Sequence, residues 1–479
     1  MSTERYDVLV LGSGAGGKLL SWHLASTGHR TAVVERRWIG GSCPNINCLP
    51  TKNEIWSAKV ADLVHHATAF GILTGSTRID MERVRQRKRE MVDGLIAMHL
   101  DHYRASGAEL IMGGARFVAP KTLDVTLNDG GRRTVVGQRV FLNLGTHSTI
   151  PPIPGLADAG SLTNIELLEI DRLPEHLVVL GGGYVGLEFA QAYRRFGSRV
   201  TVITQGAQLL EREDPDVVAE LQRILEGEGI EVLLSAAAVK VEGRSGADVR
   251  LRVQAAGGER TIAGSDILVA TGRTPNTAGI GLDVAGVELD PHGYIRVNDR
   301  LETSAPDVWA IGECAGSPQF THVSEDDFRI IRDNLAGGSR GTRGRLVPYC
   351  LFTDPPLARV GLSEREAHQQ GIAARVVKLP TAEVLRTRTI GENAGFMKLL
   401  GETPGDRILG FTMIGPEAGE VMAVVQTAML GGLPYTVLRD AILAHPTMAE
   451  GLSGLFGRVP PVSVRPHAVS SGPAASPPG

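Results

Sequence analysis

Residues 7–17 read DVLVLGSGAGG, an apolar strand that runs directly into a glycine turn and a helical stretch. The pattern returns at residues 177–186, which read LVVLGGGYVG. A strand, a Gly-x-Gly-x-x-Gly turn and a helix form the dinucleotide-binding βαβ unit, because glycines let the backbone approach a pyrophosphate at the helix N-terminus. One such motif is a weak signal. Two in this context predict two dinucleotide sites and an α/β fold.

The strand after each turn ends at a residue suited to a ribose. Strand 31–34 ends at Glu35, which we expect to accept hydrogen bonds from an adenosine ribose. Strand 199–203 ends near Gln205, which can bond a ribose hydroxyl but carries no charge for a phosphate. Glu211 and Arg212 follow it in the sequence.

Residues 40–52 read GGSCPNINCLPTK and separate Cys43 from Cys48 by four residues. A regular helix does not bring sulfurs together at this spacing, so we expect an irregular turn at a helix start. Asn47 tolerates a left-handed backbone, which we expect this turn to use. Pro50 suits the first turn of the following helix, whose dipole would lower a thiol pKa. The pair is interpreted as a redox disulfide.

Length and composition limit the function. The chain has 479 residues, enough for two to four domains, and its net charge of −4 gives no footprint for nucleic acid. No run of 18 apolar residues and no signal peptide are found, so we expect a cytoplasmic protein without a membrane span. Four cysteines do not make a secreted disulfide framework, and Cys314 and Cys350 are expected to be buried free thiols. No metal site is expected.

From about Tyr6 to Leu455 the chain resembles the class I pyridine nucleotide-disulfide oxidoreductases, which include dihydrolipoamide dehydrogenase, glutathione reductase and the core of mercuric reductase. The resemblance implies two Rossmann-like domains, for FAD and NAD(P), and a C-terminal α+β dimerisation domain. It gives residues 1–150 to the first part of the FAD-binding domain and 151–275 to the NAD(P)H-binding domain. Residues 276–344 return to the central part, 345–458 form the dimerisation domain, and the Pro-, Ser- and Ala-rich residues 459–479 are expected to be a disordered tail.

The resemblance also assigns roles to single residues. Cys48 is the flavin-facing thiol, Cys43 meets the substrate, and Lys52 lies near flavin N5 with Glu188 as its acidic partner. His445 and Glu450 form an acid–base dyad that reaches the thiols of the other subunit, which implies a homodimer with shared active sites. Tyr184 corresponds to an aromatic gate over the nicotinamide. In the family, arginines at the end of the second strand bind the 2′-phosphate of NADPH, so the uncharged Gln205 favours NADH. The implied cofactor-binding residues are Gly12, Gly14, Gly17, Glu35, Gly41, Ser42, Lys52, Gly145, Gly181, Gly183, Tyr184, Gly186, Gln205, Gly272, Arg273, Gly312 and Glu313.

The expected activity is the transfer of electrons between NADH or NADPH, FAD, the Cys43–Cys48 disulfide and a small thiol or disulfide. Residues 53–56 (Asn-Glu-Ile-Trp) are bulky and polar for this helix, and we expect them to line the substrate entrance. Reduction of a metal ion, mercuric or cupric, is an alternative. Mercury is disfavoured because mercuric reductase uses a C-terminal cysteine pair, and no cysteine follows Cys350. A flavoenzyme of the reactive-chlorine-resistance type is another relative, and a non-catalytic redox sensor is the third alternative.

Overall fold

The computed structural model describes residues 3–460, and the chain divides into two compact units between Asp354 and Pro355. The first unit contains both glycine turns and both cysteines of the thiol pair. Residues 461–479, nearly all of the tail that was predicted to be disordered, lie outside the described residues. Each unit is described by itself.

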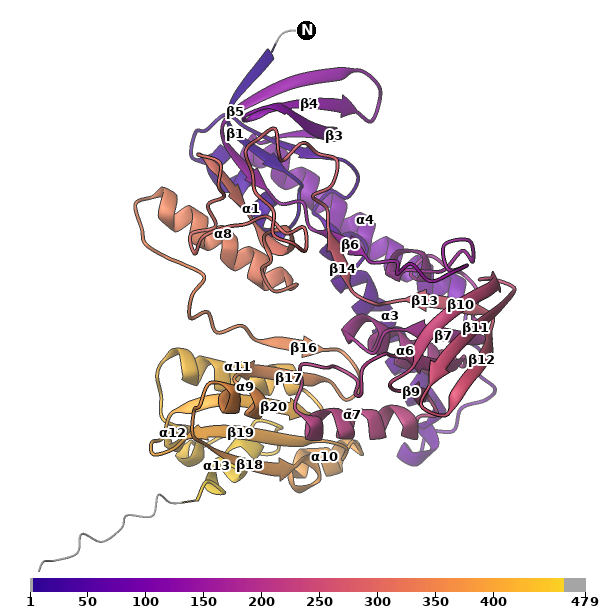
Figure 1. Cartoon of the computed structure of the whole chain (residues 1–479). Coiled ribbons are helices and arrows are strands. Elements are labelled where there is room, and N and C mark those ends of the chain that lie inside the picture. Colours follow the sequence, from indigo (N-terminus) through magenta and orange to yellow (C-terminus); the bar gives the residue numbers. More distant parts are fainter. Residues whose placement is uncertain (1–2, 461–479) are drawn as a thin grey trace, which may run out of the picture. The chain divides into compact units, whose positions relative to one another are not determined.

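The first glycine turn follows β1, a central strand of a mostly parallel sheet (Figure 1). Its parallel strands follow the order β3-β2-β1-β5-β15, and β4 pairs antiparallel with both β3 and β5. The strands are β1 (Thr3–Leu11), β2 (Thr31–Glu35), β3 (Glu109–Ala119), β4 (Thr122–Leu127), β5 (Arg132–Leu142) and β15 (Val308–Ala310).

Both faces of β1 are buried, which explains its unbroken apolar run. Leu9 and Leu11 belong to one hydrophobic cluster, whereas Val8 and Val10 belong to another. The second cluster includes side chains of three helices, α1 (Ala15–Ser26), α4 (Met81–Ser106) and α8 (Thr321–Leu335). A strand covered on both faces is typical of a parallel sheet whose connections are helices.

The second glycine turn follows a parallel sheet of its own, with strand order β13-β7-β8-β9. These strands are β7 (His176–Leu180), β8 (Arg199–Ile203), β9 (Glu231–Leu233) and β13 (Asp266–Val269). Helices α6 (Tyr184–Phe196) and α7 (Pro215–Gly227) follow β7 and β8. Between β9 and β13 lies an antiparallel sheet of β10 (Ala237–Arg244), β11 (Asp248–Ala255) and β12 (Gly258–Gly264).

The chain passes between the two βαβ units on paired segments. β6 (Thr146–Ser148) leads out of the sheet of the first βαβ unit, and β14 (Arg273–Pro275) leads back towards it. They pair antiparallel, with Ser148 opposite Arg273. The short helix α5 (Asn164–Leu167) follows the outgoing segment.

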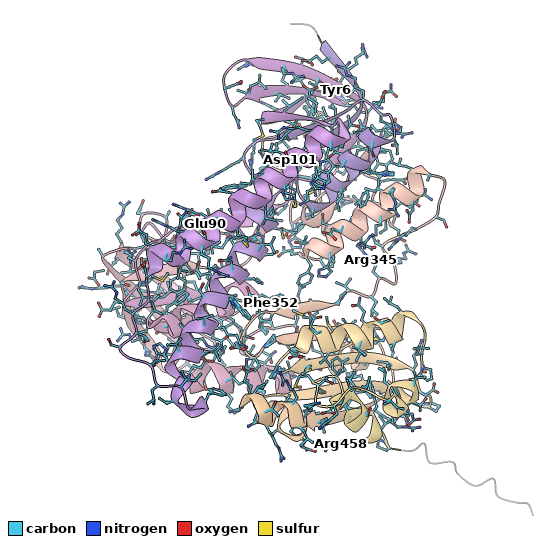
Figure 2. The ribbon with its side chains drawn as sticks, turned by 180° about the vertical axis from the view of Figure 1, so that it is seen from behind. Tyr6, Glu90, Asp101, Arg345, Phe352 and Arg458 are labelled. Atoms are coloured by element: carbon cyan, nitrogen blue, oxygen red, sulfur yellow. The ribbon has the colours of Figure 1, made fainter. Side chains whose placement is uncertain are left out.

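Two helices connect the thiol segment to the second sheet. α2 (Ser42–Asn45) and α3 (Cys48–His65) follow the first sheet's second strand, and α3 packs against both α4 and α6. Figure 2 shows α4 along its length, with Glu90 and Asp101 marking two positions on it. The packing of α3 on α6 brings the first turn of the thiol helix to the helix of the second glycine turn.

The second unit is an α+β domain. Its antiparallel strands follow the order β17-β20-β19-β18, and α11 packs against β17 and β20. The strands are β17 (Leu357–Gly361), β18 (Ala374–Pro380), β19 (Phe396–Glu402) and β20 (Ile408–Ile414). The helices are α9 (Glu364–Gln369), α10 (Leu385–Ile390), α11 (Ala418–Leu430), α12 (Tyr435–Asp440) and α13 (Gly451–Gly457). The architecture confirms the predicted fold class. Within residues 3–460, every helix is too short or too polar to cross a membrane.

Candidate active site

The two glycine turns have the same backbone geometry. Gly12 and Gly181 have φ of +93° and +118°, and a Cβ on either would collide with a carbonyl oxygen of the strand alongside, Asn143 or Ala270. Only glycine fits a left-handed turn this close to another backbone. The turns therefore repeat each other in structure as they do in sequence.

The third glycine of each motif lets the helix approach its strand. A Cβ on Gly17 would collide with the carbonyl oxygen of Gly12, and one on Gly186 with that of Gly181. The helices α1 and α6 consequently begin against their turns, which places the positive end of each helix dipole there. In α1 the N–H groups of Gly16 and Gly17 already donate to Ser324 and Asn143, both at 3.1 Å.

Asn143 fastens the first turn, and the sequence did not single it out. Its Oδ1 accepts from the Gly17 N–H at 3.1 Å, and its Nδ2 donates to the Ile311 carbonyl at 3.0 Å. Its own N–H donates to Leu11 at 2.7 Å. Asn143 thus connects β1, α1 and the segment after β15.

The Glu35 carboxylate lies beside the first turn but is already engaged. One oxygen accepts from the N–H and hydroxyl of Ser13, both at 2.9 Å. The other accepts from the N–H groups of Arg37 at 2.8 Å and Trp38 at 2.9 Å. A ribose hydroxyl bound here would have to exchange with one of these donors, and the ribose contact remains a prediction.

The thiol segment has the predicted irregular turn. Cys43 lies in the four-residue helix α2 and Cys48 is the first residue of α3, with Pro50 in its first turn as expected. Gly41, before Ser42, has φ of +81°, and a Cβ on it would lie 2.5 Å from the Cα of Gly14. The thiol segment therefore touches the first glycine turn.

The predicted left-handed conformation of Asn47 is wrong. Its φ is −130°, and the positive φ angles of this segment belong to Gly40 and Gly41. The Asn47 side chain has another role, because its Oδ1 accepts from Asn164 Nδ2 at 2.7 Å, which also donates to the Ile46 carbonyl at 2.6 Å. Asn47 ties the thiol turn to α5.

The two thiols of the pair differ in acidity. Cys43 and Cys48 hydrogen-bond each other, and this contact lowers the pKa of Cys48 to about 6 while raising that of Cys43. The hydroxyl of Thr321, 3.5 Å from Cys48 Sγ, and the nearby Lys52 ammonium lower the Cys48 pKa further. Cys48 is therefore the more acidic thiol of the pair, and its role as the flavin-facing thiol stays a prediction.

Lys52 and Glu188 lie together as expected. Lys52 Nζ donates to Glu188 Oε2 at 2.6 Å, and the carboxylate is 5% exposed. The other oxygen of Glu188 accepts from the Phe352 N–H at 2.9 Å, and Lys52 Nζ lies 4.8 Å from the Phe352 ring centroid. Figure 2 marks Phe352. Cys48 and Lys52 both lie in the first turns of α3. The Lys52 ammonium is therefore close to the Cys48 sulfur and is also bonded to the buried carboxylate of Glu188.

Tyr184, the predicted gate, is held by a buried carboxylate. Its hydroxyl donates to Glu213 Oε1 at 3.1 Å, and the hydroxyl of Tyr349, in β16 (Tyr349–Leu351), donates to the same oxygen at 2.5 Å. The two rings meet edge to face at 6.0 Å. Glu213 and Tyr349 were missed because no motif contains them.

The Glu313 carboxylate, just after β15, is engaged by two other residues of the protein. It accepts from the Thr146 hydroxyl and lies 3.4 Å from Arg273 Nε, while Arg273 also donates to Thr146. The carboxylate that bonds the Gly312 N–H is instead Asp327, at 2.7 Å. The cofactor contacts predicted for Glu313 and Arg273 therefore remain predictions.

Three further predicted residues lie where the strands of the two sheets end. Gly145 accepts from the Asn276 N–H at 3.0 Å, and Gly272 accepts from the Thr149 N–H at 2.9 Å. Gln205 is exposed immediately beyond β8. These hydrogen bonds do not test whether the three residues contact a nucleotide, and that contact stays a prediction.

The prediction that residues 53–56 line the substrate entrance is wrong for Glu54. Its side chain is 2% exposed in the packing of α3 on α6, next to Tyr193. Burial raises the pKa of Glu54 to about 7. Trp56, in contrast, is 58% exposed. A helix with polar residues at successive positions turns one of them inward, which composition alone does not reveal.

The second unit contains the predicted dyad. His445 Nδ1 lies 2.8 Å from Glu450 Oε2, with His445 exposed and Glu450 mostly buried at the start of α13. The carboxylate holds the exposed ring through Nδ1, so Nε2 is the ring nitrogen left for proton transfer. Of the other cysteines, Cys314 is a fully buried free thiol as predicted, and Cys350 is half-buried and forms no disulfide.

Two nucleotide-binding turns beside a thiol pair and a Lys–Glu pair define a flavin-linked disulfide oxidoreductase. Comparison with known families agrees. Residues 6–327 match the pyridine nucleotide-disulphide oxidoreductase model, and residues 347–455 match the dimerisation domain of the same proteins. The chain belongs to the pyridine nucleotide-disulphide oxidoreductase family. It is therefore an enzyme that uses FAD and NAD(P)H.

Individual relatives cover nearly the whole chain. The probable pyridine nucleotide-disulfide oxidoreductase RclA of Escherichia coli K12 is 35% identical over 95% of this chain and 100% of its own length. Mercuric reductase of Acidithiobacillus ferrooxidans is 34% identical over 94% of this chain and 82% of its own length. The solved HOCl-induced flavoprotein disulfide reductase RclA of Escherichia coli superposes with a TM-score of 0.86 at 34% identity, covering 95% of this chain and 100% of that one.

The first turn fits the pyrophosphate of FAD. Gly12, Gly14 and Gly41 converge without side chains, and a Cβ on Gly14 would lie 2.5 Å from Asn143 Oδ1. This leaves a backbone surface at the N-terminus of α1, where N–H groups and the helix dipole favour phosphate. The enzyme class excludes the non-catalytic sensor among the alternatives.

Proposed function

We propose that this enzyme reduces small disulfides with electrons from a reduced nicotinamide, through the Cys43–Cys48 pair. FAD, when bound, supplies the two-electron link between the nicotinamide and the thiols. The observation that carries the proposal is the adjacency of two hydrogen-bonded thiols to the Lys52–Glu188 pair at the start of α3. The Lys52 ammonium, in the first turns of α3, stabilises the negative charge of the Cys48 thiolate.

The thiols act in order. In the reduced enzyme the dyad takes the proton of the Cys43 thiol. The Cys43 sulfur then attacks one sulfur of the substrate, whose S–S bond breaks as the mixed disulfide with Cys43 forms. The released thiolate takes a proton from the acid–base dyad. The Cys48 thiolate then attacks Cys43, which releases the second thiolate and leaves the Cys43–Cys48 disulfide. This second thiolate takes its proton from solvent. Two electrons pass to the substrate, and its two thiols leave with two protons.

The dyad is proposed to act on the thiols of a second copy. His445 of one subunit would hold the proton at Nε2, while Glu450 stabilises the imidazolium through Nδ1. The dimerisation domain supports a homodimer. So does an apolar surface just before the dyad, whose exposed side chains are Leu430, Leu433, Val437 and Ile442, the last fully exposed. Four large apolar side chains within 13 residues of chain favour burial against a second copy.

Assay of NADH consumption with small disulfides tests the proposal. We expect turnover with cystine, cystamine or lipoamide, and loss of at least 100-fold in Cys43→Ser. The same variant should still reduce a quinone, because a quinone accepts electrons without the thiols. Cys314→Ala, a buried thiol outside the pair, is the matched control and should retain disulfide turnover. Equal disulfide rates in Cys43→Ser and wild type would contradict the proposal.

Copper(II) is a second candidate acceptor. The RclA relative of Escherichia coli has been solved as a Cu(II) complex, with a TM-score of 0.86. The half-buried Cys43 and Cys48 form a pair of soft ligands of the kind that favours copper after reduction. Cu(II)-dependent NADH oxidation that Cys43→Ser abolishes, at rates above those with disulfides, would favour this acceptor.

The location of the enzyme, its domain boundaries and its cofactor-binding residues are also proposals. We place the enzyme in the cytoplasm, where a persistent disulfide is usually catalytic. We divide it at the predicted boundaries: 1–150 and 276–344 for FAD, 151–275 for the nicotinamide and 345–458 for dimerisation. The predicted cofactor-binding residues are part of this proposal.

A further inference from the structure

The carboxylate of Glu211, in the loop that follows β8, lies close to the end of that strand. Gly206 follows Gln205 at this strand end, and a Cβ on Gly206 would lie 2.5 Å from Oε1 of Glu211. The same Cβ would lie 3.1 Å from the Gln208 carbonyl oxygen. The Glu211 carboxylate therefore occupies the space in which a side chain of residue 206 would begin.

Three hydrogen bonds hold the loop that carries Glu211, two of them between backbone groups. The N–H of Leu210, its neighbour, donates to Gly182 in the second glycine turn at 3.0 Å. Gly206 accepts from the Ser235 N–H at 2.8 Å, and its own N–H donates to the Thr204 hydroxyl at 3.3 Å. The loop is thus tied both to the glycine turn and to the end of the strand. It brings Glu211 to the edge where β7 and β8 end.

We infer that Glu211 selects NADH over NADPH in this enzyme. In a dinucleotide-binding unit the adenosine ribose lies beyond the second strand, and an acidic residue there bonds the 2′-hydroxyl. Gln205, the residue at the strand end, carries no charge, and Glu211 supplies the missing carboxylate through the space left by Gly206. The inference rests on the proposed function only in assigning the nicotinamide cofactor to the second glycine turn.

The charge of the carboxylate gives the selection its direction. A ribose hydroxyl donates a hydrogen bond to it, whereas the 2′-phosphate of NADPH brings up to two further negative charges against it. Glu211 is exposed, so the repulsion is screened by salt. We therefore expect a preference on the order of tenfold at low salt, and a smaller one at high salt.

A preference for NADPH over NADH would depend on Arg212. It is exposed and directly follows Glu211. A guanidinium binds phosphate in two-pronged fashion, and arginine at such a strand end is typical of NADPH sites. The two residues therefore make opposite predictions that single substitutions separate.

Equilibrium binding tests the inference without turnover. Isothermal titration of the FAD-loaded protein with NAD⁺ and with NADP⁺ gives the ratio of the two dissociation constants, at 20 mM and 300 mM salt. The variants are Glu211→Gln and Arg212→Gln. The matched control is Glu259→Gln, an exposed carboxylate in β12 that pairs with Arg252. Flavin content and circular dichroism confirm that each variant is folded.

We expect wild type to bind NAD⁺ about tenfold more tightly than NADP⁺, with a smaller ratio at 300 mM salt. Glu211→Gln should bring the ratio close to one, chiefly by tighter NADP⁺ binding, while Glu259→Gln keeps the wild-type ratio. Preferential NADP⁺ binding by wild type, lost in Arg212→Gln, would overturn the inference. So would an unchanged ratio in Glu211→Gln. Because both nucleotides bind without the thiols, either result leaves the disulfide relay to its own test.

Discussion

Lys52 and Glu188 form an ion pair of 2.6 Å that joins α3, which starts at Cys48, to α6, which starts at the second glycine turn. The pair belongs to two different βαβ units, and its carboxylate is 5% exposed. The contact joins the helix that begins at Cys48 to the helix that follows the second glycine turn. A change at either residue should therefore affect both stability and electron transfer.

Lys52→Met should destabilise the protein by about 1–3 kcal/mol, because it leaves the Glu188 carboxylate without its cation in a mostly buried site. The double variant Lys52→Met/Glu188→Gln should recover part of this loss, since no charge remains unpaired. Urea unfolding of the FAD-loaded protein measures both. Lys121→Met, which breaks an exposed pair with Asp307, is the control and should cost less than about 0.5 kcal/mol. Equal losses at Lys52 and Lys121 would contradict a structural role for the pair.

Thr321→Val should raise the pKa of the Cys48 thiol in the reduced enzyme. The pKa is lowered to about 6, in part by the Thr321 hydroxyl, which can hydrogen-bond the thiolate. Losing that bond should move the midpoint upward by about 0.5–1 pH unit. The long-wavelength absorbance of thiolate and flavin, followed from pH 4 to 9, reports the midpoint. Thr389→Val, an exposed threonine in the second unit, should leave it unchanged. A midpoint in Thr321→Val equal to wild type would remove this residue from the site.

Glu54→Gln should stabilise the protein at alkaline pH. The folded pKa of about 7 lies above the usual 4.5, so the folded state holds the proton more tightly. The stability that this proton contributes is complete below pH 4.5 and is lost as the pH rises through 7. We expect wild type to lose about 3 kcal/mol across this range relative to Glu54→Gln. Urea unfolding at pH 5 and pH 8 measures it, with Glu288→Gln, an exposed carboxylate, as control. A pH-independent difference would show that Glu54 does not titrate in the core.

Subunit complementation tests the shared active site. Cys43→Ser and His445→Gln homodimers should each lose disulfide turnover by at least 100-fold. A purified heterodimer of the two variants contains one site with Cys43 from one chain and His445 from the other. If the dyad serves the partner's thiols, that heterodimer should regain up to about half of the wild-type rate. A heterodimer as inactive as its parents would place thiol and dyad of a working site in the same chain.

The sequence predicted what repeats and what lies close along the chain. Both glycine turns, the irregular thiol turn and the start of α3 at Cys48 follow from local spacing. The dyad follows from a short separation between His445 and Glu450. The Lys52–Glu188 contact needed the family resemblance, because its residues lie 136 positions apart.

The sequence did not predict contacts that depend on packing between distant segments. Asn143 and Thr321 reach the first turn and the thiol from segments with no motif, and Glu213 joins Tyr184 to Tyr349 only through the loop after β8. The expectation for Asn47 failed because the positive φ angles of the thiol segment lie at Gly40 and Gly41, before Cys43, and the backbone of Asn47 has φ of −130°. That for Glu54 failed because polarity indicated exposure, whereas helix packing turned the side chain inward.

The most direct test of the central claim is an anaerobic titration of the purified enzyme with NADH while the flavin spectrum is recorded. The proposed relay predicts a long-wavelength band after two electrons, from the Cys48 thiolate beside the flavin. The band should be absent in Cys48→Ser and present in Cys314→Ala. Simple bleaching of the flavin in wild type, without that band, would show that the thiols are not coupled to it and would contradict the proposed function.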